Sequence, residues 1–254
     1  MRQLFLESPV WLVGGVVTIL MVVAAEVGYH VGKRSVSCNS GVGAVKASAL
    51  ALVGLLLAFS YSIAAGHYDR RKQVVVGEAK ALRASWLRTD LADDSSRSRA
   101  RALIRSIVDA RLQSFDRTAG AGAGRLADQQ VYAAQSELWA LAADQMRQSK
   151  EPEKHMLLAL AVSDVVDRTE ERAAAVEYRV PAPVLYLLTA TILMSGFLVG
   201  LSSGQDNRRI PLLWGIVIAL MVAVLVTIFD LDNPGRGIVP DRPKPLEDLS
   251  AQIS

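Results

Sequence analysis

The chain has 254 residues, of which 51% are hydrophobic and 21% are charged, with a formal net charge of +3 at pH 7. It is too apolar for an ordinary soluble domain and too charged to lie in a membrane throughout, so the placement of the charges decides its class. The single cysteine, Cys38, excludes an internal disulfide, and three scattered histidines provide no zinc-ligand spacing.

Four windows of 18 to 26 residues contain no Asp, Glu, Lys or Arg: 8–25, 47–66, 180–205 and 210–229. A helix needs about 20 residues to cross a hydrocarbon core of about 30 Å. Backbone inside lipid must satisfy its own hydrogen bonds, so helices are predicted rather than strands. Four buried helices of a soluble protein would need a larger polar shell than this chain provides. The fold class is therefore predicted as all-α, a polytopic membrane protein with spans at about 9–27, 47–66, 182–203 and 210–229.

The first window follows Arg2, as the apolar part of a signal peptide would. A cleavable signal has an apolar region of only about 7–15 residues, so a retained span is predicted here. Glu26 lies one turn inside the expected end of that span. Carboxylates inside membranes often mark functional sites, but a glutamate at the interface can also reach water. Both interpretations of Glu26 stay open.

The spans divide the chain into a transmembrane hairpin (1–66), a helical domain (67–180), a second transmembrane hairpin (181–230) and a tail (231–254). An even number of spans places both termini and the helical domain on one side of the membrane. Basic residues flank both sides, so the positive-inside rule only leans towards a cytoplasmic helical domain and cytoplasmic termini.

The segment 67–180 holds 19 of the 28 basic and 17 of the 25 acidic residues. This near-balance argues against a nucleic-acid partner, whose binding surface would show a basic excess. Apolar residues recur at steps of three and four from the second span onward, which predicts that its helix continues into the domain. These residues are Val75, Ala79, Leu82 and Trp86, with Leu87 and Leu91 beyond them.

Further helices are predicted along the domain. Asp93-Asp94-Ser95-Ser96 is expected to form a loop before a second helix. The glycines of Thr118–Gly124 predict another loop, because glycine loses much backbone freedom inside a helix. No strand precedes them and no Gly-Lys-Ser/Thr follows, so they do not indicate a phosphate site. Two more helices are predicted at Leu126–Arg147 and Pro152–Glu177.

Motifs of catalysis are lacking from the sequence: we find no Gly-x-Ser-x-Gly, His-Glu-x-x-His, Walker loop or Ser-x-x-Lys setting. Asp164, Arg168 and Glu171 stand at helical spacing, and we expect them to form exposed ion pairs. The sequence therefore predicts neither an enzyme nor a cofactor or metal site.

Three groups of residues carry a resemblance. The second span and its continuation contain Phe59, Tyr68 with Arg71, Glu78-Ala79 and Leu87-Arg88. The first span ends Glu26-Val-Gly28-Tyr-His-Val-Gly32-Lys33-Arg34, and the fourth is followed by Asp230-Leu-Asp232-Asn-Pro234. In these motifs, and in its layout over nearly the whole chain, the sequence resembles the bacterial bestrophin-like family of four-span proteins. It resembles the bestrophin anion channels more distantly.

The resemblance implies a homo-oligomer, a pentamer if it follows the bestrophins, in the bacterial cytoplasmic (inner) membrane. It implies passive conduction of small anions through a pore lined by the second span, with the lipid bilayer and further copies of the chain as partners. The pore neck would then lie at Ala51, Leu55 and Phe59, which share one stripe of a helix. The alternative is that these three residues face lipid or pack against other helices, because every span must have apolar stripes.

The sequence also departs from the channel pattern. Ala51 is small for a neck, and leucine separates Asp230 from Asp232 where animal bestrophins have an acidic calcium-binding run. An EF-hand loop begun at Asp230 matches only in part, since Pro234 replaces a ligand position. Helix-end and turn chemistry around Asn233-Pro234-Gly235 is the competing interpretation of the two aspartates. A non-conducting scaffold or envelope sensor, whose helical domain binds a partner, remains the second functional hypothesis.

Overall fold

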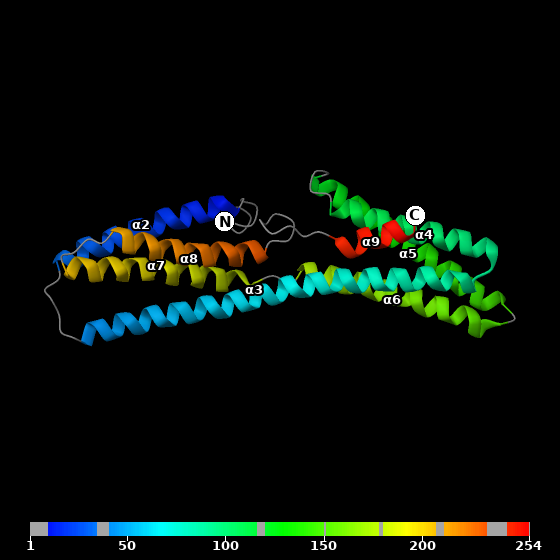
Figure 1. Ribbon diagram of the computed structural model, residues 1–254, viewed down its shortest axis with the longest axis horizontal. Helices are drawn as coiled ribbons and strands as arrows, with labels where there is room; N and C mark the ends of the chain where they lie inside the picture. Colours follow the sequence, from blue (N-terminus) through cyan, green and yellow to red (C-terminus); the bar gives the residue numbers. More distant parts are fainter. Residues whose placement is uncertain are drawn as a thin grey trace. The chain divides into compact units, whose positions relative to one another are not determined.

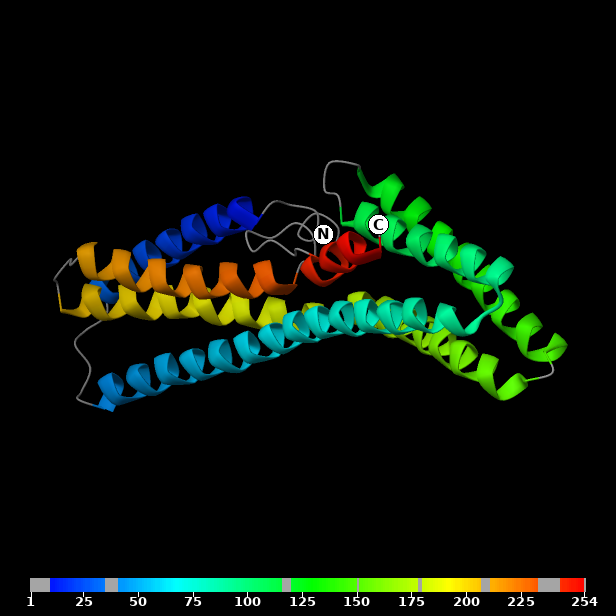
Figure 2. The ribbon, with the colours of Figure 1, turned by 45° about the vertical axis from the view of Figure 1, so that its right-hand side comes forward.

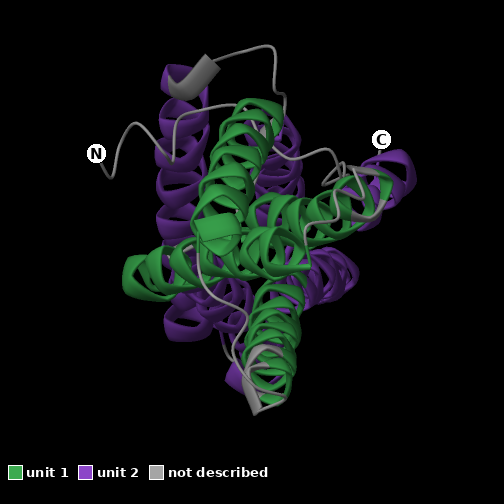
Figure 3. Ribbon diagram, turned by 90° about the vertical axis from the view of Figure 1, so that its left-hand side faces the viewer, with its two compact units in different colours: residues 1–68, 179–239 green, residues 69–178, 240–254 purple. Residues whose placement is uncertain are grey.

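The computed structural model describes residues 10–34, 41–115, 120–149, 151–177, 180–206, 211–232 and 243–253. Its chain divides into two compact units, which Figure 3 colours separately. The membrane unit comprises Met1–Tyr68 and Arg179–Val239, and the helical unit comprises Asp69–Tyr178 and Pro240–Ser254. The Asn233-Pro234-Gly235 turn predicted from the sequence lies outside the described residues.

The membrane unit contains α2 (Val10–Arg34), the first part of α3 (Gly41–Arg88), α7 (Ala182–Gln205) and α8 (Pro211–Asp232). Each of these four helices is long and apolar enough to cross a bilayer. The prediction of an all-α polytopic membrane protein with four transmembrane helices is therefore confirmed. Figures 1 and 2 show α2, α7 and α8 gathered in one bundle, in which α2 makes its closest contact with α7.

Helices α2 and α7 run parallel in close contact, and glycines make the contact possible. A methyl group built on Gly28 would overlap the backbone of Phe197, and one on Gly200 would overlap the carbonyl of Ala25. A methyl group on Gly204 would likewise overlap the carbonyl of Tyr29. Because lipid tails are as apolar as the side chains, such close packing replaces the hydrophobic effect as the force that joins helices in a membrane.

Helix α8 packs against α2 in the opposite direction. Gly14, near the start of α2, lies against Val226 near the end of α8. At the other end, the rings of Tyr29 and Trp214 meet edge to face with their centroids 5.9 Å apart. Trp214 Nε1 also donates a hydrogen bond to Ser203 Oγ of α7 at 2.9 Å. An aromatic cluster thus ties three helices together near one end of the unit, where Trp and Tyr are favoured in membrane proteins.

The helical unit contains the second part of α3, a 3₁₀ turn η1 (Thr89–Leu91) and four further helices. These are α4 (Asp94–Ser114), α5 (Gly120–Gln148), α6 (Pro152–Glu177) and α9 (Lys244–Ile253). Figures 1 and 2 show α6 beside the second part of α3. One apolar core joins these helices, with Leu82, Ile104, Leu138 and Leu158 fully buried. The predicted core stripe is confirmed at Ala79, Leu82 and Trp86, which all pack in this core.

Three sequence-based expectations for this unit need correction. Gly120–Gly124 is not a loop but the start of α5, where Gly122 and Gly124 have open space at the position that a side chain would occupy. Residues 116–119 lie outside the described residues. Helix α4 begins at Asp94, inside the predicted Asp93–Ser96 loop. Leu87 is 60% exposed and does not extend the core face.

The segment after the fourth span was expected only as a tail, but it contains α9. Leu246, Leu249 and Ile253 are buried in the core of the helical unit. The main-chain oxygen of Ile253 accepts a hydrogen bond from Arg105 Nε of α4 at 2.6 Å. These three apolar residues follow the spacing of three and four that buries one face of a helix. The C-terminal residues are therefore part of the helical unit.

Candidate functional site

The predicted neck residues lie on one exposed face of α3 in the membrane unit. Leu55 is 52% exposed and Phe59 is 60% exposed, and Ala51 is exposed one turn earlier. A single copy of the chain thus leaves an apolar stripe uncovered. This stripe could line a pore, face lipid or pack against another copy. The pore-lining role of these residues stays a prediction.

The other face of α3 is covered by the rest of the membrane unit. Val53, Leu57, Ser60 and Ala64 are all buried, and they follow each other at steps of three and four. Leu57 lies on the stripe opposite the predicted neck and does not face lipid. It is only 6% exposed, because the stripe opposite the exposed one is the face that packs within the unit.

Glu26 stands two turns before the end of α2, with its side chain 42% exposed. Its Oε2 lies 4.0 Å from His30 Nε2, one turn further along the same helix. The structure does not bring Glu26 and the neck residues into one site. Its functional role stays a prediction.

Asp230 and Asp232 are both buried at the end of α8. Asp232 Oδ1 accepts a hydrogen bond from the main-chain N–H of Val180 at 2.8 Å. Val180 lies two residues before the first residue of α7, so this contact fixes the entry of one span against the exit of another. The arrangement supports the helix-end interpretation of Asp232, whose carboxylate accepts a hydrogen bond from a main-chain N–H just ahead of α7.

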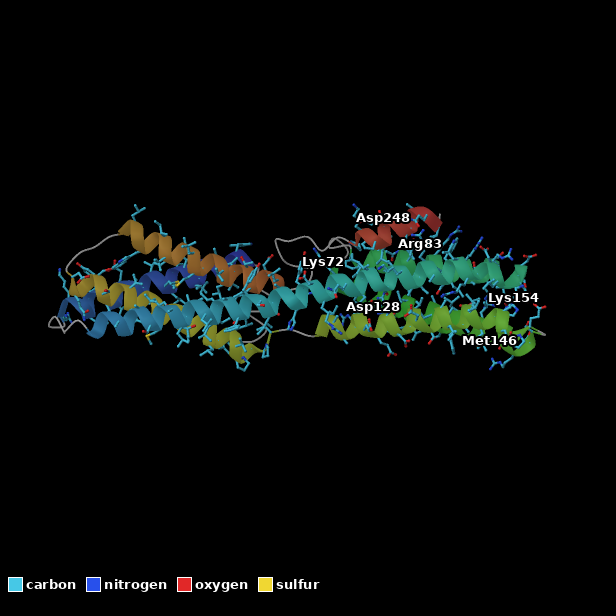
Figure 4. All side chains as sticks on the ribbon, turned by 60° about the horizontal axis from the view of Figure 1, so that its bottom comes forward. Lys72, Arg83, Asp128, Met146, Lys154 and Asp248 are labelled. Carbon is cyan, nitrogen blue, oxygen red and sulfur yellow. The ribbon has the colours of Figure 1, made fainter. Side chains whose placement is uncertain are left out.

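Among the residues that the structure describes, a concentration of buried charge lies in the helical unit, around Glu78 of α3. The Glu78 carboxylate has no exposed surface and binds two guanidinium groups. Arg111 Nε of α4 lies 2.6 Å from its Oε1, and Arg172 Nη1 of α6 lies 2.8 Å from its Oε2. Arg111 Nη1 also contacts Oδ1 of Asp128, the α5 residue labelled in Figure 4, at 2.8 Å. Asp128 is half exposed and lies at the edge of the group, while the other three side chains are mostly or fully buried. We call these four residues the buried ion cluster.

Neutral groups complete the cluster. Thr169 Oγ1 lies 3.4 Å from Arg111 Nη2 and accepts a hydrogen bond from Gln135 Nε2 at 2.5 Å. The Arg172 guanidinium stacks on Phe115, with Cζ 4.6 Å from the ring centroid. Burial lowers the pKa of Arg172 from its ordinary value, although the charge of Glu78 opposes that shift.

The arrangement of this cluster fits a structural role in positioning helices better than a catalytic role. Each carboxylate oxygen of Glu78 already has a guanidinium partner, and two arginines balance two acids. Four helices, α3, α4, α5 and α6, each supply one charged member, so the cluster sets their mutual register. An exposed group of the expected kind lies nearby: Arg168 contacts Asp164 at 3.3 Å and Glu171 at 3.0 Å, as predicted.

The sequence analysis did not identify the cluster, although two signals were present. Glu78 lies between Val75 and Leu82 on the apolar stripe, where a charge needs a buried partner. Arg111 likewise follows Ile104 and Ile107 on the buried face of α4. The glycines of the α2–α7 contact also show spacing of four, at 28 and 32 and at 196, 200 and 204.

Comparison with known proteins adds one match. A family model described as Bestrophin-like domain matches residues 11–246. No curated protein and no solved structure matches the chain. The matched region includes all four membrane helices and extends into α9.

Proposed function

The chain belongs to the Bestrophin-like family, and from that premise we propose that it forms a homo-oligomeric channel for passive conduction of small anions. The pore would be lined by the first part of α3. The observation that carries the proposal is the exposed apolar stripe of Ala51, Leu55 and Phe59, which the chain's own helices leave uncovered. Copies arranged around an axis would convert this stripe into rings.

An apolar ring controls ion flow through hydration. An ion that passes Leu55 and Phe59 must shed water without gaining polar contacts, so the ring sets a barrier that narrow dry pores use as a gate. The basic excess of the chain, and Lys33 and Arg34 at the last turn of α2, favour anions near one pore entrance. We place the protein in a bacterial cytoplasmic membrane with the helical unit in the cytoplasm.

The experiment is a current measurement on purified protein in planar bilayers. Phe59→Ala removes most of the bulkiest side chain of the stripe and should raise unitary conductance, and Leu55→Ser should do the same by wetting the constriction. Leu220→Ser provides the matched control, because Leu220 is 64% exposed on α8, away from the stripe. It should leave conductance unchanged.

Oligomeric mass in detergent is measured on the same samples. A monomer or dimer could not enclose a pore with one α3 stripe per copy, and that result would exclude the channel. Wild-type and Phe59→Ala proteins that assemble correctly but stay electrically silent would also exclude it.

The second candidate function is a non-conducting membrane scaffold whose helical unit binds a partner. It is favoured by apolar side chains that remain exposed on α5 and α6, among them Tyr132, Trp139 and Leu160. Under this alternative Phe59→Ala opens no current and instead lowers oligomer yield through lost packing.

A further inference from the structure

The helical unit has a cavity of about 360 Å³ between α5 and α6. Tyr132 and Trp139 stand two turns apart on α5 and line it, with Ser136 between them. Ser163 and Glu170 line it from α6. Spacing of three, four and seven places each set on one face of its helix, so the two faces form the walls.

The two aromatic rings are unusually open to solvent for a helical domain. Tyr132 is 48% exposed and Trp139 is 45% exposed. Both belong to a helix whose opposite side is firmly buried through Val131 and Leu138. The rings are therefore held in place by a packed helix while their outer faces remain accessible.

The floor of the cavity is rigid. Gln135 lines it and is only 3% exposed. Gln135 Nε2 donates a hydrogen bond to Thr169 Oγ1, which in turn lies within the buried ion cluster around Glu78. A cavity whose floor is fixed in this way is present before a ligand arrives, which reduces the entropy cost of binding.

The charge of the cavity is negative. Glu170 is its single charged lining residue, and within the described part of the chain Glu170 has no hydrogen bond or ion pair. Its neighbours on α6 differ, since Asp164 and Glu171 are both paired with Arg168. A free carboxylate next to two electron-rich rings favours a cation and disfavours an anion.

We propose that this cavity, the α5–α6 pocket, binds a small organic cation of the alkylammonium class. Trp139 and Tyr132 would contact the methyl or methylene groups around the nitrogen through cation–π interactions, and Glu170 would balance the charge. The size fits, because pockets for small molecules start at about 300 Å³. A bare divalent metal ion does not fit, since Glu170 is the single carboxylate among the lining residues and the remaining oxygens belong to neutral hydroxyl and amide groups.

The test uses full-length protein in detergent and radiolabelled choline as the probe, with bound choline measured by equilibrium dialysis. Choline should bind saturably. Its uncharged carbon isostere, 3,3-dimethylbutan-1-ol, should fail to displace it, because the cation–π and charge contributions both need the positive nitrogen.

Variants locate the binding to the pocket. Trp139→Leu and Glu170→Gln should each weaken choline binding by about tenfold, since each removes one attraction to the cation. Trp139→Phe keeps a ring and should retain part of the affinity. Glu153→Gln is the matched control, because Glu153 is exposed on α6 outside the pocket. It should bind as wild type.

Three outcomes would overturn the proposal. The first is a lack of saturable choline binding up to ~10 mM, a concentration at which even a weak specific site fills. The second is equal displacement by the uncharged isostere, which would make the pocket an apolar patch. The third is dissociation of the oligomer by Trp139→Leu or Trp139→Phe, which would make it an interface between copies of the chain. Each readout is independent of ion conduction.

Discussion

At the scale of single residues, Glu78 shows how a charge can be tolerated inside an apolar core. Taking a carboxylate out of water is costly, and the cost is offset here by two guanidinium groups, each within hydrogen-bonding distance. The arrangement makes Glu78 indispensable to its neighbours. Without its charge, Arg111 and Arg172 would face each other with Asp128 alone to balance them.

We therefore expect Glu78→Gln to lower the stability of the purified protein by about 3 kcal/mol, the loss typical when a buried ion pair loses one partner. The measurement is thermal unfolding in detergent. Glu137→Gln is the matched control, because the Glu137–Arg99 pair is exposed on both sides and such pairs contribute at most about 1 kcal/mol. Equal, small shifts for both variants would contradict the structural role of the cluster.

At the scale of elements, the α2–α7 contact depends on the absence of side chains. Gly28 and Gly32 on one helix and Gly200 and Gly204 on the other allow the backbones to approach until a single methyl group would no longer fit. Not every helical glycine has this role. Gly15, on the same α2, has open space where a side chain would point.

This difference predicts opposite outcomes for two identical substitutions. Gly200→Ala should force α2 and α7 apart and destabilise the membrane unit by about 1–3 kcal/mol, as overpacking does elsewhere. Gly15→Ala should be neutral or slightly stabilising, because alanine is the better helix former. The measurement is thermal unfolding together with the yield of folded protein. A neutral Gly200→Ala would mean that the two helices are not in this close contact.

At the scale of the whole molecule, the segment after the fourth span returns to the helical unit. Because α9 packs on α4 within that unit, the C-terminus and the segment between the second and third spans share one side of the membrane. An even number of spans between them also places the helical unit's two parts, the segment between spans two and three and the C-terminus, on the same side. The structure and the span count thus agree on which parts lie together, while the side itself rests on the basic residues near the spans.

Reporter fusions test the orientation. A reporter fused after Arg125 and one at the C-terminus should both report the cytoplasm, and one inserted at Ser40 should report the outside. An external signal at Arg125 with an internal one at Ser40 would reverse the orientation and leave the four spans intact. Signals from Arg125 and the C-terminus on opposite sides would contradict the packing of α9.

Much of the architecture was determined by the sequence alone. Windows free of charge identify membrane spans because an unpaired charge in lipid is costly wherever it lies, a rule that needs no tertiary contact. The helix Pro152–Glu177 was predicted with its observed bounds, since proline starts it and apolar spacing continues it. The exposed ion pairs of Arg168 could also be predicted, because their partners lie only three and four residues away along the helix.

Tertiary structure alone decided what depends on residues distant in the chain. Glu78 meets Arg111 and Arg172 across 33 and 94 positions, and helical spacing cannot indicate which buried charges find each other. Leu57 and Leu55 are equally apolar, so only packing reveals that one is covered and the other exposed. The glycines of α5 suggested a loop by propensity, but propensity is weak and the helix continues through them. The α5–α6 pocket likewise exists only where two distant helix faces meet.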